Sequence, residues 1–191
     1  MRPAPLLVLT DRFRCTRRLT DVIGTAVDCG ARAVVLREKD LAEAERRDLA
    51  EELRAMLEPV GGVLICAGRC GEAVHLSAAD DFPDVRPSMV GRSCHCAAEV
   101  TQAAAEGCDY VTVSPVFLTA SKPGYGPALD VDGLARLARH APAAYALGGV
   151  QPADVGACLA AGAYGVAVMG PVMADPRLVA AYLSALQAVP A

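Results

Sequence analysis

The feature that most constrains the fold of this chain is the alternation of short apolar runs with longer amphipathic segments along its whole length. Such alternation is typical of β/α units built on a parallel sheet. Eight runs have the length and composition of buried strands: 6–10, 33–37, 62–67, 73–77, 89–93, 109–115, 143–149 and 165–170. Segments with helical periodicity lie between them, at about 19–29, 40–58, 96–106, 130–140, 152–161 and 176–188.

Eight strands with intervening helices predict a closed (β/α)8 TIM barrel, formed as one domain by residues 1–191. An open doubly wound sheet is the alternative, because a strand count from pattern alone does not show closure. Only Gly68 to Glu72 separate the third run from the fourth, which is too short for a helix that crosses back over the sheet. We therefore expect the third helix to be missing or shortened.

Composition and charge exclude several classes of protein. The chain is 53% hydrophobic with a formal net charge of −4, so it lacks the basic surplus that a nucleic-acid backbone requires. The first apolar run, Pro5 to Leu9, is too short for a signal sequence, and no run approaches 18 apolar residues. These features predict a cytoplasmic protein without membrane or nucleic-acid partners, and they leave a homo-oligomer open.

The eight cysteines have two interpretations. In a chain of this size without secretory features, reduced structural thiols are the simpler one. The alternative is a zinc site formed by soft ligands of two segments, although their spacing matches no common zinc motif. Its candidate ligands are Cys66, Cys70, Cys94, His95 and Cys96.

Polar and charged residues follow five of the eight predicted strands, the first, second, fourth, fifth and sixth. Because all strands of a parallel barrel end at one face, these residues are expected to converge there. They are basic and hydroxylic, as a phosphorylated ligand requires. The candidates after the second to sixth strands are Arg37, Lys39, Asp80, Ser93, Thr119, Ser121 and Lys122.

The last two strands end in Gly148-Gly149 and Met169-Gly170. Small residues there allow close approach of the backbone, and the loops after strands seven and eight are the usual phosphate site of such barrels. Each group taken alone also fits a turn or a solvated charge cluster. Their joint placement favours a phosphate ligand. Of the three histidines, His75 is expected in the core, His140 at an exposed helix end and His95 at the mouth.

In this order the motifs LVLTDR, VVLREKD, VHLSAAD, VGRSCHC, DYVTVSPVFLTASK, ALGGV and AGAYGVAVMG resemble those of the thiamine phosphate synthase family over nearly the whole chain. The resemblance implies a (β/α)8 barrel enzyme. It would join a hydroxymethylpyrimidine diphosphate to a thiazole phosphate and release diphosphate with the help of Mg²⁺.

The resemblance also implies roles for the candidate residues. Four would act on the diphosphate: Arg37, Lys39, Ser93 and Lys122. Asp80 would be a Mg²⁺ ligand. The thiazole phosphate would be bound by Thr119 and Ser121 together with the backbone of Gly149, Met169 and Gly170.

The sequence departs from the family at two places. Family members usually carry Gln two places before the arginine of LREK, where this chain has Val35. After the third strand they carry an Asn-Asp-Arg type motif with a second Mg²⁺ carboxylate, and here the sequence reads CAGRCGE. Two alternatives therefore stay open. One is a phosphate-binding paralogue without catalysis, and the other is a thiazole tautomerase-like enzyme, which would need a histidine where this chain has Ser114.

Overall fold

The computed structural model describes residues 2–68, 71–118 and 127–188. Eight parallel strands form a closed barrel in which each strand pairs with the next along the chain and β8 pairs with β1. The strands are β1 Leu6–Leu9, β2 Ala33–Leu36, β3 Val63–Ala67, β4 Ala73–Leu76, β5 Met89–Cys94, β6 Tyr110–Val113, β7 Ala144–Leu147 and β8 Gly165–Val168. The predicted closed barrel is thus confirmed, and the open sheet is excluded.

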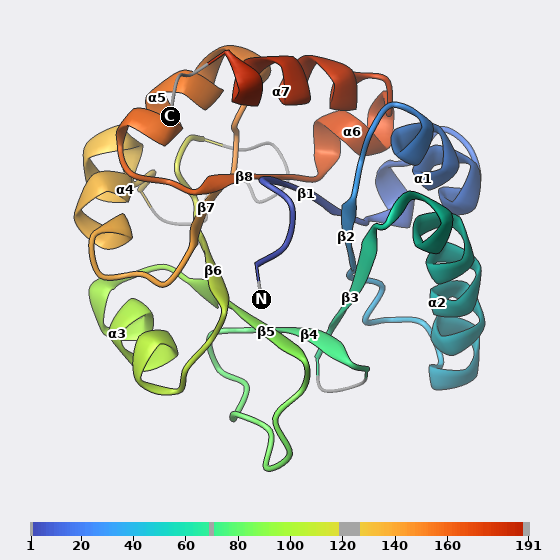
Figure 1. The fold of residues 1–191 in the computed structure, drawn as a ribbon, viewed down its shortest axis with the longest axis horizontal. Coiled ribbons are helices and arrows are strands. Elements are labelled where there is room, and N and C mark those ends of the chain that lie inside the picture. Colours follow the sequence, from blue (N-terminus) through green and yellow to red (C-terminus); the bar gives the residue numbers. More distant parts are fainter. Residues whose placement is uncertain (1, 69–70, 119–126, 189–191) are drawn as a thin grey trace.

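Helices surround most of the barrel (Figure 1). They are α1 Leu19–Asp28, α2 Glu43–Leu57, α3 Ala97–Ala105, α4 Asp130–Ala138, α5 Val155–Ala160, α6 Gly170–Ala174 and α7 Leu178–Gln187. Short 3-10 turns occupy η1 Arg12–Arg14, η2 Glu58–Val60 and η3 Pro152–Asp154. The helix α6 was not predicted, because we assigned Gly170 to the end of a strand.

Two consecutive units lack a helix; from the sequence we named only the first as shortened, and we assigned no helical segment to the second. Five residues separate β3 from β4, as predicted. The longer segment 77–88, which is described throughout, also contains no helix. Figure 1 accordingly shows loops but no helix outside β4 and β5.

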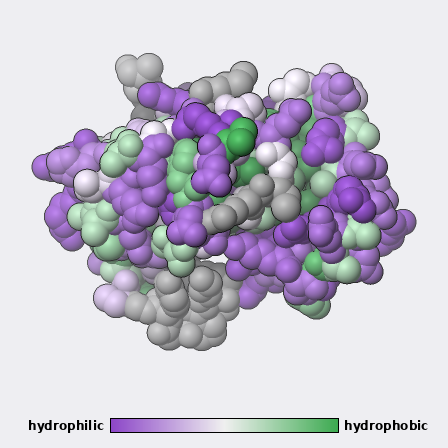
Figure 2. Space-filling view, turned by 90° about the horizontal axis from the view of Figure 1, so that it is seen from below, coloured by the Kyte–Doolittle hydropathy of each residue, from purple (hydrophilic) through white to green (hydrophobic). Residues whose placement is uncertain are grey.

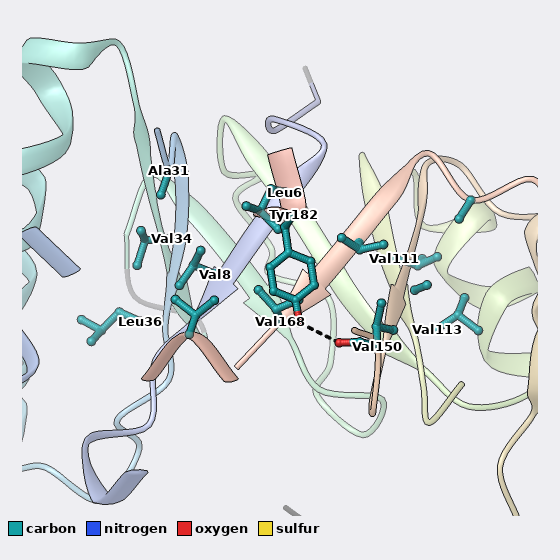
Figure 3. Close-up of a cluster of buried hydrophobic side chains, with 14 of the residues drawn as sticks. Leu6, Val8, Ala31, Val34, Leu36, Val111, Val113, Val150, Val168 and Tyr182 are labelled. Atoms are coloured by element: carbon teal, nitrogen blue, oxygen red, sulfur yellow. Dashed lines mark hydrogen bonds between the residues drawn. The ribbon is translucent and has the colours of Figure 1, made fainter. Parts of the chain in front are cut away.

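The core has two layers, because successive residues of a strand point to opposite faces. Side chains facing outward, such as Val8, Val34 and Val111, pack against the helices. In the same layer the Tyr182 hydroxyl of α7 donates to the Val150 carbonyl oxygen at 2.8 Å (Figure 3). The inner layer fills the barrel with side chains such as Leu7 and Val35.

Segment 77–88 covers the side of the barrel that has no helix. Val74 and Val90 are fully buried there, and Phe82 of the segment packs against this outer core layer. Figure 2 views the protein from this side, where the surface is mostly hydrophilic with small scattered hydrophobic areas. The loop therefore replaces a helix in shielding β4 and β5 from water.

Candidate phosphate-binding site

The motif REKD, residues 37–40, follows β2, and its acidic and basic side chains differ in their contacts. The acidic ones pair with Arg12, which follows β1. Arg12 donates from its backbone and from Nη1 to the two carboxylate oxygens of Glu38, at 3.1 and 3.0 Å. Its guanidinium also holds both oxygens of Asp40, and these hydrogen bonds lower the pKa of Asp40. Glu38 is only 2% exposed. Both carboxylates of the motif are thus committed to Arg12.

The two cations of the motif are placed differently. Arg37 and Lys39 are exposed, and no hydrogen bond or ion pair of their side chains is found within the described ranges. The backbone of Arg37 is fixed because its N–H donates to the buried Thr10 hydroxyl at 2.9 Å. Two positive groups on a fixed backbone are therefore available to an anion at the barrel mouth.

A buried histidine contacts one of the predicted site residues, Ser93. His75 of β4 is 7% exposed, and its Nε2 lies 2.9 Å from the Ser93 hydroxyl on β5. Burial, together with the positive charges of Lys39, Arg92 and Arg37, lowers the pKa of His75 to about 4. Because the strands of this closed barrel are parallel, the loop after β2 lies on the same rim as the carboxyl ends of β4 and β5. His75 is a core histidine, as predicted, and it also contacts Ser93.

Asp80 extends the site on the loop after β4. The negative charge of Asp80 also acts on His75, where it opposes the lowering of the pKa. One carboxylate oxygen of Asp80 accepts a hydrogen bond from the Ser77 N–H at 2.7 Å. The carboxylate is therefore held at the same end of the barrel as Ser93.

A buried arginine holds this loop in place. Arg92 of β5 is 0% exposed, and its guanidinium lies between the loop after β4 and the end of α3. Its Nη1 donates to the carbonyl oxygens of Ser77, Ala78 and Asp80, at 3.0, 3.3 and 2.7 Å. Its Nη2 forms a 2.7 Å ion pair with Glu106 at the end of α3, at an angle outside hydrogen-bond geometry. We did not predict this role, although an arginine within the apolar run MVGRS was a signal that could have indicated it.

The glycines after β7 allow close packing against the loop that follows β6. Gly149 has a φ of 69°, and a Cβ atom there would lie 2.5 Å from the Leu118 carbonyl oxygen and 2.8 Å from the Phe117 Cβ. Only glycine fits this position. At Gly170 a Cβ would meet only Arg14, at 3.8 Å, so the backbone of Met169-Gly170 is more open. Because β7 and β8 are paired, Gly149 and Met169 end neighbouring strands.

Several predicted residues cannot be placed. Thr119, Ser121 and Lys122 lie outside the described residues, immediately after the Phe117-Leu118 segment that packs on Gly149. Cys70 of the alternative zinc site also lies outside them. Among the residues that are described, no group of three or more His, Cys, Asp or Glu could hold a metal, and the described cysteines form no disulfide with one another. His95 lies at the mouth as expected, with Nδ1 2.7 Å from the Ser114 carbonyl oxygen.

Comparison with known proteins identifies the family. A family model described as thiamine monophosphate synthase matches residues 6–172. The chain belongs to the thiamine monophosphate synthase family. A thiamine-phosphate synthase of Methanoregula boonei is 34% identical over 80% of this chain and 77% of its own length. Another, of Roseiflexus castenholzii, is 33% identical over 88% of this chain and 81% of its own.

The fold of the family is also found among solved structures. A thiamine phosphate pyrophosphorylase from Pyrococcus furiosus superposes with a TM-score of 0.83 at 22% identity, covering 95% of both chains. At that identity the likeness supports the barrel alone. Across the described segments, no helix is long and apolar enough to cross a membrane.

Proposed function

We propose that this member of the family is a thiamine-phosphate synthase, a transferase that joins hydroxymethylpyrimidine diphosphate to hydroxyethylthiazole phosphate. The observation that carries the proposal, beyond family membership, is the division of charge in the motif REKD. Arg12 pairs with Glu38 and Asp40, which leaves Arg37 and Lys39 without a described partner. They follow β2 on the rim at which β5, the strand of Ser93, also ends. Two cations with no described partner fit a ligand that carries a diphosphate.

The reaction needs positioning and charge more than proton transfer. The bond between the pyrimidine methylene carbon and the diphosphate oxygen breaks, and its electron pair leaves with the diphosphate. The electron-rich aminopyrimidine stabilises the resulting cation until the thiazole nitrogen supplies the pair for the new C–N bond. Arg37, Lys39 and Lys122 would stabilise the charge on the departing diphosphate, with Ser93 as a hydrogen-bond donor.

The second substrate would bind on the opposite part of the rim. We propose that the backbone of Gly149, Met169 and Gly170, with the hydroxyls of Thr119 and Ser121, holds the thiazole phosphate. The support is that Gly149 packs directly on the segment that leads to these hydroxyls. The diphosphate would then lie over the ends of β2 to β5 and the thiazole phosphate over the ends of β6 to β8, with Lys122 of the segment after β6 reaching toward the diphosphate.

We propose that Asp80 would hold a Mg²⁺ ion together with oxygens of the substrate phosphates. Mg²⁺ is commonly held by one or two carboxylates together with substrate phosphates and water. Asp80 has one oxygen hydrogen-bonded to the Ser77 N–H, and Arg92 fixes its loop. When bound, the ion would neutralise negative charge on the diphosphate. The proposal also includes small phosphorylated substrates as the partners and a cytoplasmic location, both as expected from the sequence.

The test is direct assay of the purified chain. Incubation with both substrates and Mg²⁺ should yield thiamine phosphate, measured as thiochrome fluorescence after oxidation, with an equal amount of released diphosphate. The variant Lys122→Ala should lower kcat/KM by about 100-fold, because it removes a charge placed for the transition state. Arg139→Ala, at the end of α4, is the matched loss of an exposed cation and should leave the rate unchanged. No product with either Mg²⁺ or Mn²⁺ would favour the non-catalytic paralogue.

A further inference from the structure

Three polar side chains from three neighbouring strands form a buried hydrogen-bonded chain below the mouth. The ring of Tyr110 on β6 lies over Gly91 of β5 and reaches His75 on β4. Its hydroxyl oxygen is 3.0 Å from Nδ1 of His75, and the two rings stack with their centroids 5.5 Å apart. On the other side of the imidazole, Nε2 is 2.9 Å from the Ser93 hydroxyl.

The direction of each hydrogen bond follows from counting protons. His75 has a lowered pKa and is neutral near pH 7, so its ring carries one proton and one lone pair. Burial raises the pKa of the Tyr110 phenol well above its usual range, so that hydroxyl keeps its proton. Among the described residues, Nδ1 of His75 is the partner found for this hydroxyl. Tyr110 therefore donates to Nδ1, and the ring proton lies on Nε2.

The opposite arrangement is unfavourable. If Nδ1 carried the proton and donated it to Tyr110, the phenol proton would be buried without an acceptor, which costs about 1–3 kcal/mol. With the proton on Nε2, His75 donates to the Ser93 oxygen. The hydroxyl proton of Ser93 is then left for an acceptor on the side of the mouth, where Ser93 is half-buried.

We propose that Tyr110 and His75 are positioning residues that orient Ser93 as a hydrogen-bond donor toward an anionic oxygen of the ligand. This inference rests on the proposed function, because it takes the ligand to be the diphosphate group. It explains why a tyrosine crosses a strand to contact a histidine that is too deeply buried and too weakly basic to exchange protons with the substrate. It also favours a ligand that presents an acceptor to Ser93, since no acceptor for its hydroxyl proton is found among the described residues.

The tautomer can be measured without turnover. Long-range ¹H–¹⁵N correlation spectra of the full-length protein at pH 7 contain only three histidines, His75, His95 and His140, and the variant His75→Gln assigns the signals. We expect His75 to be the Nε2–H tautomer. In Tyr110→Phe the fixed donor to Nδ1 is lost, and a mixture of tautomers should appear. A wild-type signal of the Nδ1–H tautomer would overturn the proposal, whether or not the chain is a synthase.

A double-mutant cycle tests the link to the ligand. Ser93→Ala should lower kcat/KM about 100-fold, and Tyr110→Phe about tenfold, as expected for one hydrogen bond that is lost and one that is misdirected. In the Ser93→Ala background, Tyr110→Phe should have no further effect, because the residue it orients is gone. Fully additive effects would show that Tyr110 does not act through Ser93.

The matched control is Tyr145→Phe. Tyr145 is a buried tyrosine of the neighbouring strand β7, and its hydroxyl donates to the Pro3 carbonyl oxygen at the other end of the barrel. It should lose stability like Tyr110→Phe but keep a wild-type rate. If the wild type makes no product, the same cycle is measured as the affinity for inorganic diphosphate with Mg²⁺ by calorimetry. If Ser93→Ala then binds inorganic diphosphate as tightly as the wild type does, the proposal is refuted.

Discussion

The ring of Tyr110 occupies the space that any side chain larger than hydrogen at position 91 would fill. Gly91 and Tyr110 are register partners on β5 and β6, so the glycine allows the tyrosine to cross its strand. A residue that lacks a side chain thereby determines which group can reach His75. The hydrogen bond between Tyr110 of β6 and His75 of β4 therefore depends on the absence of a side chain at Gly91 of β5.

Gly91→Ala should therefore destabilise the protein and displace Tyr110. Forcing a methyl group into this space is expected to cost about 1–3 kcal/mol in the free energy of unfolding, measured by urea denaturation. The NMR signals of His75 should change as its partner moves. Gly24→Ala is the matched control, since a Cβ at that position of α1 contacts nothing within 4 Å and should stabilise the helix slightly. Equal stability of the two variants would contradict this account.

Arg92 should matter to stability more than an exposed arginine of the same region. Arg92→Met keeps much of the side-chain volume, but it removes three hydrogen bonds to the loop after β4 and leaves Glu106 without its cation. Loss of one partner of a buried pair is expected to cost about 3–5 kcal/mol. Limited proteolysis should then cut within 77–88.

The control for Arg92 is Arg86→Met, in the same loop. Arg86 is exposed and pairs with Asp109 at 3.0 Å, so its loss should cost less than about 1 kcal/mol. In the double variant Arg92→Met with Glu106→Gln, stability should recover in part while the loop stays sensitive to protease. Resistance of that loop in both variants would show that Arg92 does not hold it.

Substitutions within the REKD motif should affect either activity or stability, depending on whether the side chain is paired. Arg37→Ala and Lys39→Ala should leave the free energy of unfolding within about 0.5 kcal/mol of wild type, because neither side chain has a partner among the described residues. Both should raise KM for the pyrimidine diphosphate. Glu38→Gln should do the reverse and lower stability, since this buried carboxylate accepts two hydrogen bonds from Arg12. A stable Glu38→Gln protein beside an unstable Arg37→Ala protein would reverse the assignment.

Much of the fold could be predicted from the sequence, because buried parallel strands are short apolar runs. All eight strands overlap their predicted ranges. The helix α6 was missed because it has only five residues and begins at Gly170-Pro171, which read as the end of a strand. No helical segment was predicted between the fourth and fifth strands, and the structure has none there. The sequence did not indicate that Arg92 holds this loop through carbonyl oxygens 12 to 15 positions away.

The candidate site was predictable as a set of residues but not as an arrangement. Barrel topology places strand ends on one rim, so Arg37, Lys39 and Ser93 could be grouped from the sequence. The sequence does not show which charged side chains of the motif REKD are paired, because Arg12 lies 26 residues from Glu38 in the chain. For the same reason His75 was assigned to the core without its link to Ser93. Such pairings depend on tertiary contacts that local patterns do not contain.

The free energy of unfolding should decrease in acid, because His75 has a lower pKa in the folded protein than in the unfolded chain. Burial, with Lys39, Arg92 and Arg37, lowers its pKa from 6.5 to about 4 despite the opposing charge of Asp80. Between these two values the unfolded chain binds a proton that the folded protein does not, so stability decreases as pH falls through this window and is constant above it. The loss attributable to this group is about 3 kcal/mol by pH 4. Urea unfolding from pH 7.5 to 4.5 should show a smaller decrease for His75→Gln, whereas His140→Gln should follow wild type.

Chemical modification of lysine offers a separate test of the site. The chain has only two lysines, Lys39 and Lys122, and both are proposed to contact the diphosphate. An amine-selective acylating reagent should therefore inactivate the enzyme, because acylation removes the positive charge. Inorganic diphosphate with Mg²⁺ should protect both residues, as measured by peptide mass spectrometry, while the N-terminal amine continues to react. Full activity after acylation of both lysines would exclude them from the site, and protection of Lys39 alone would separate Lys122 from it.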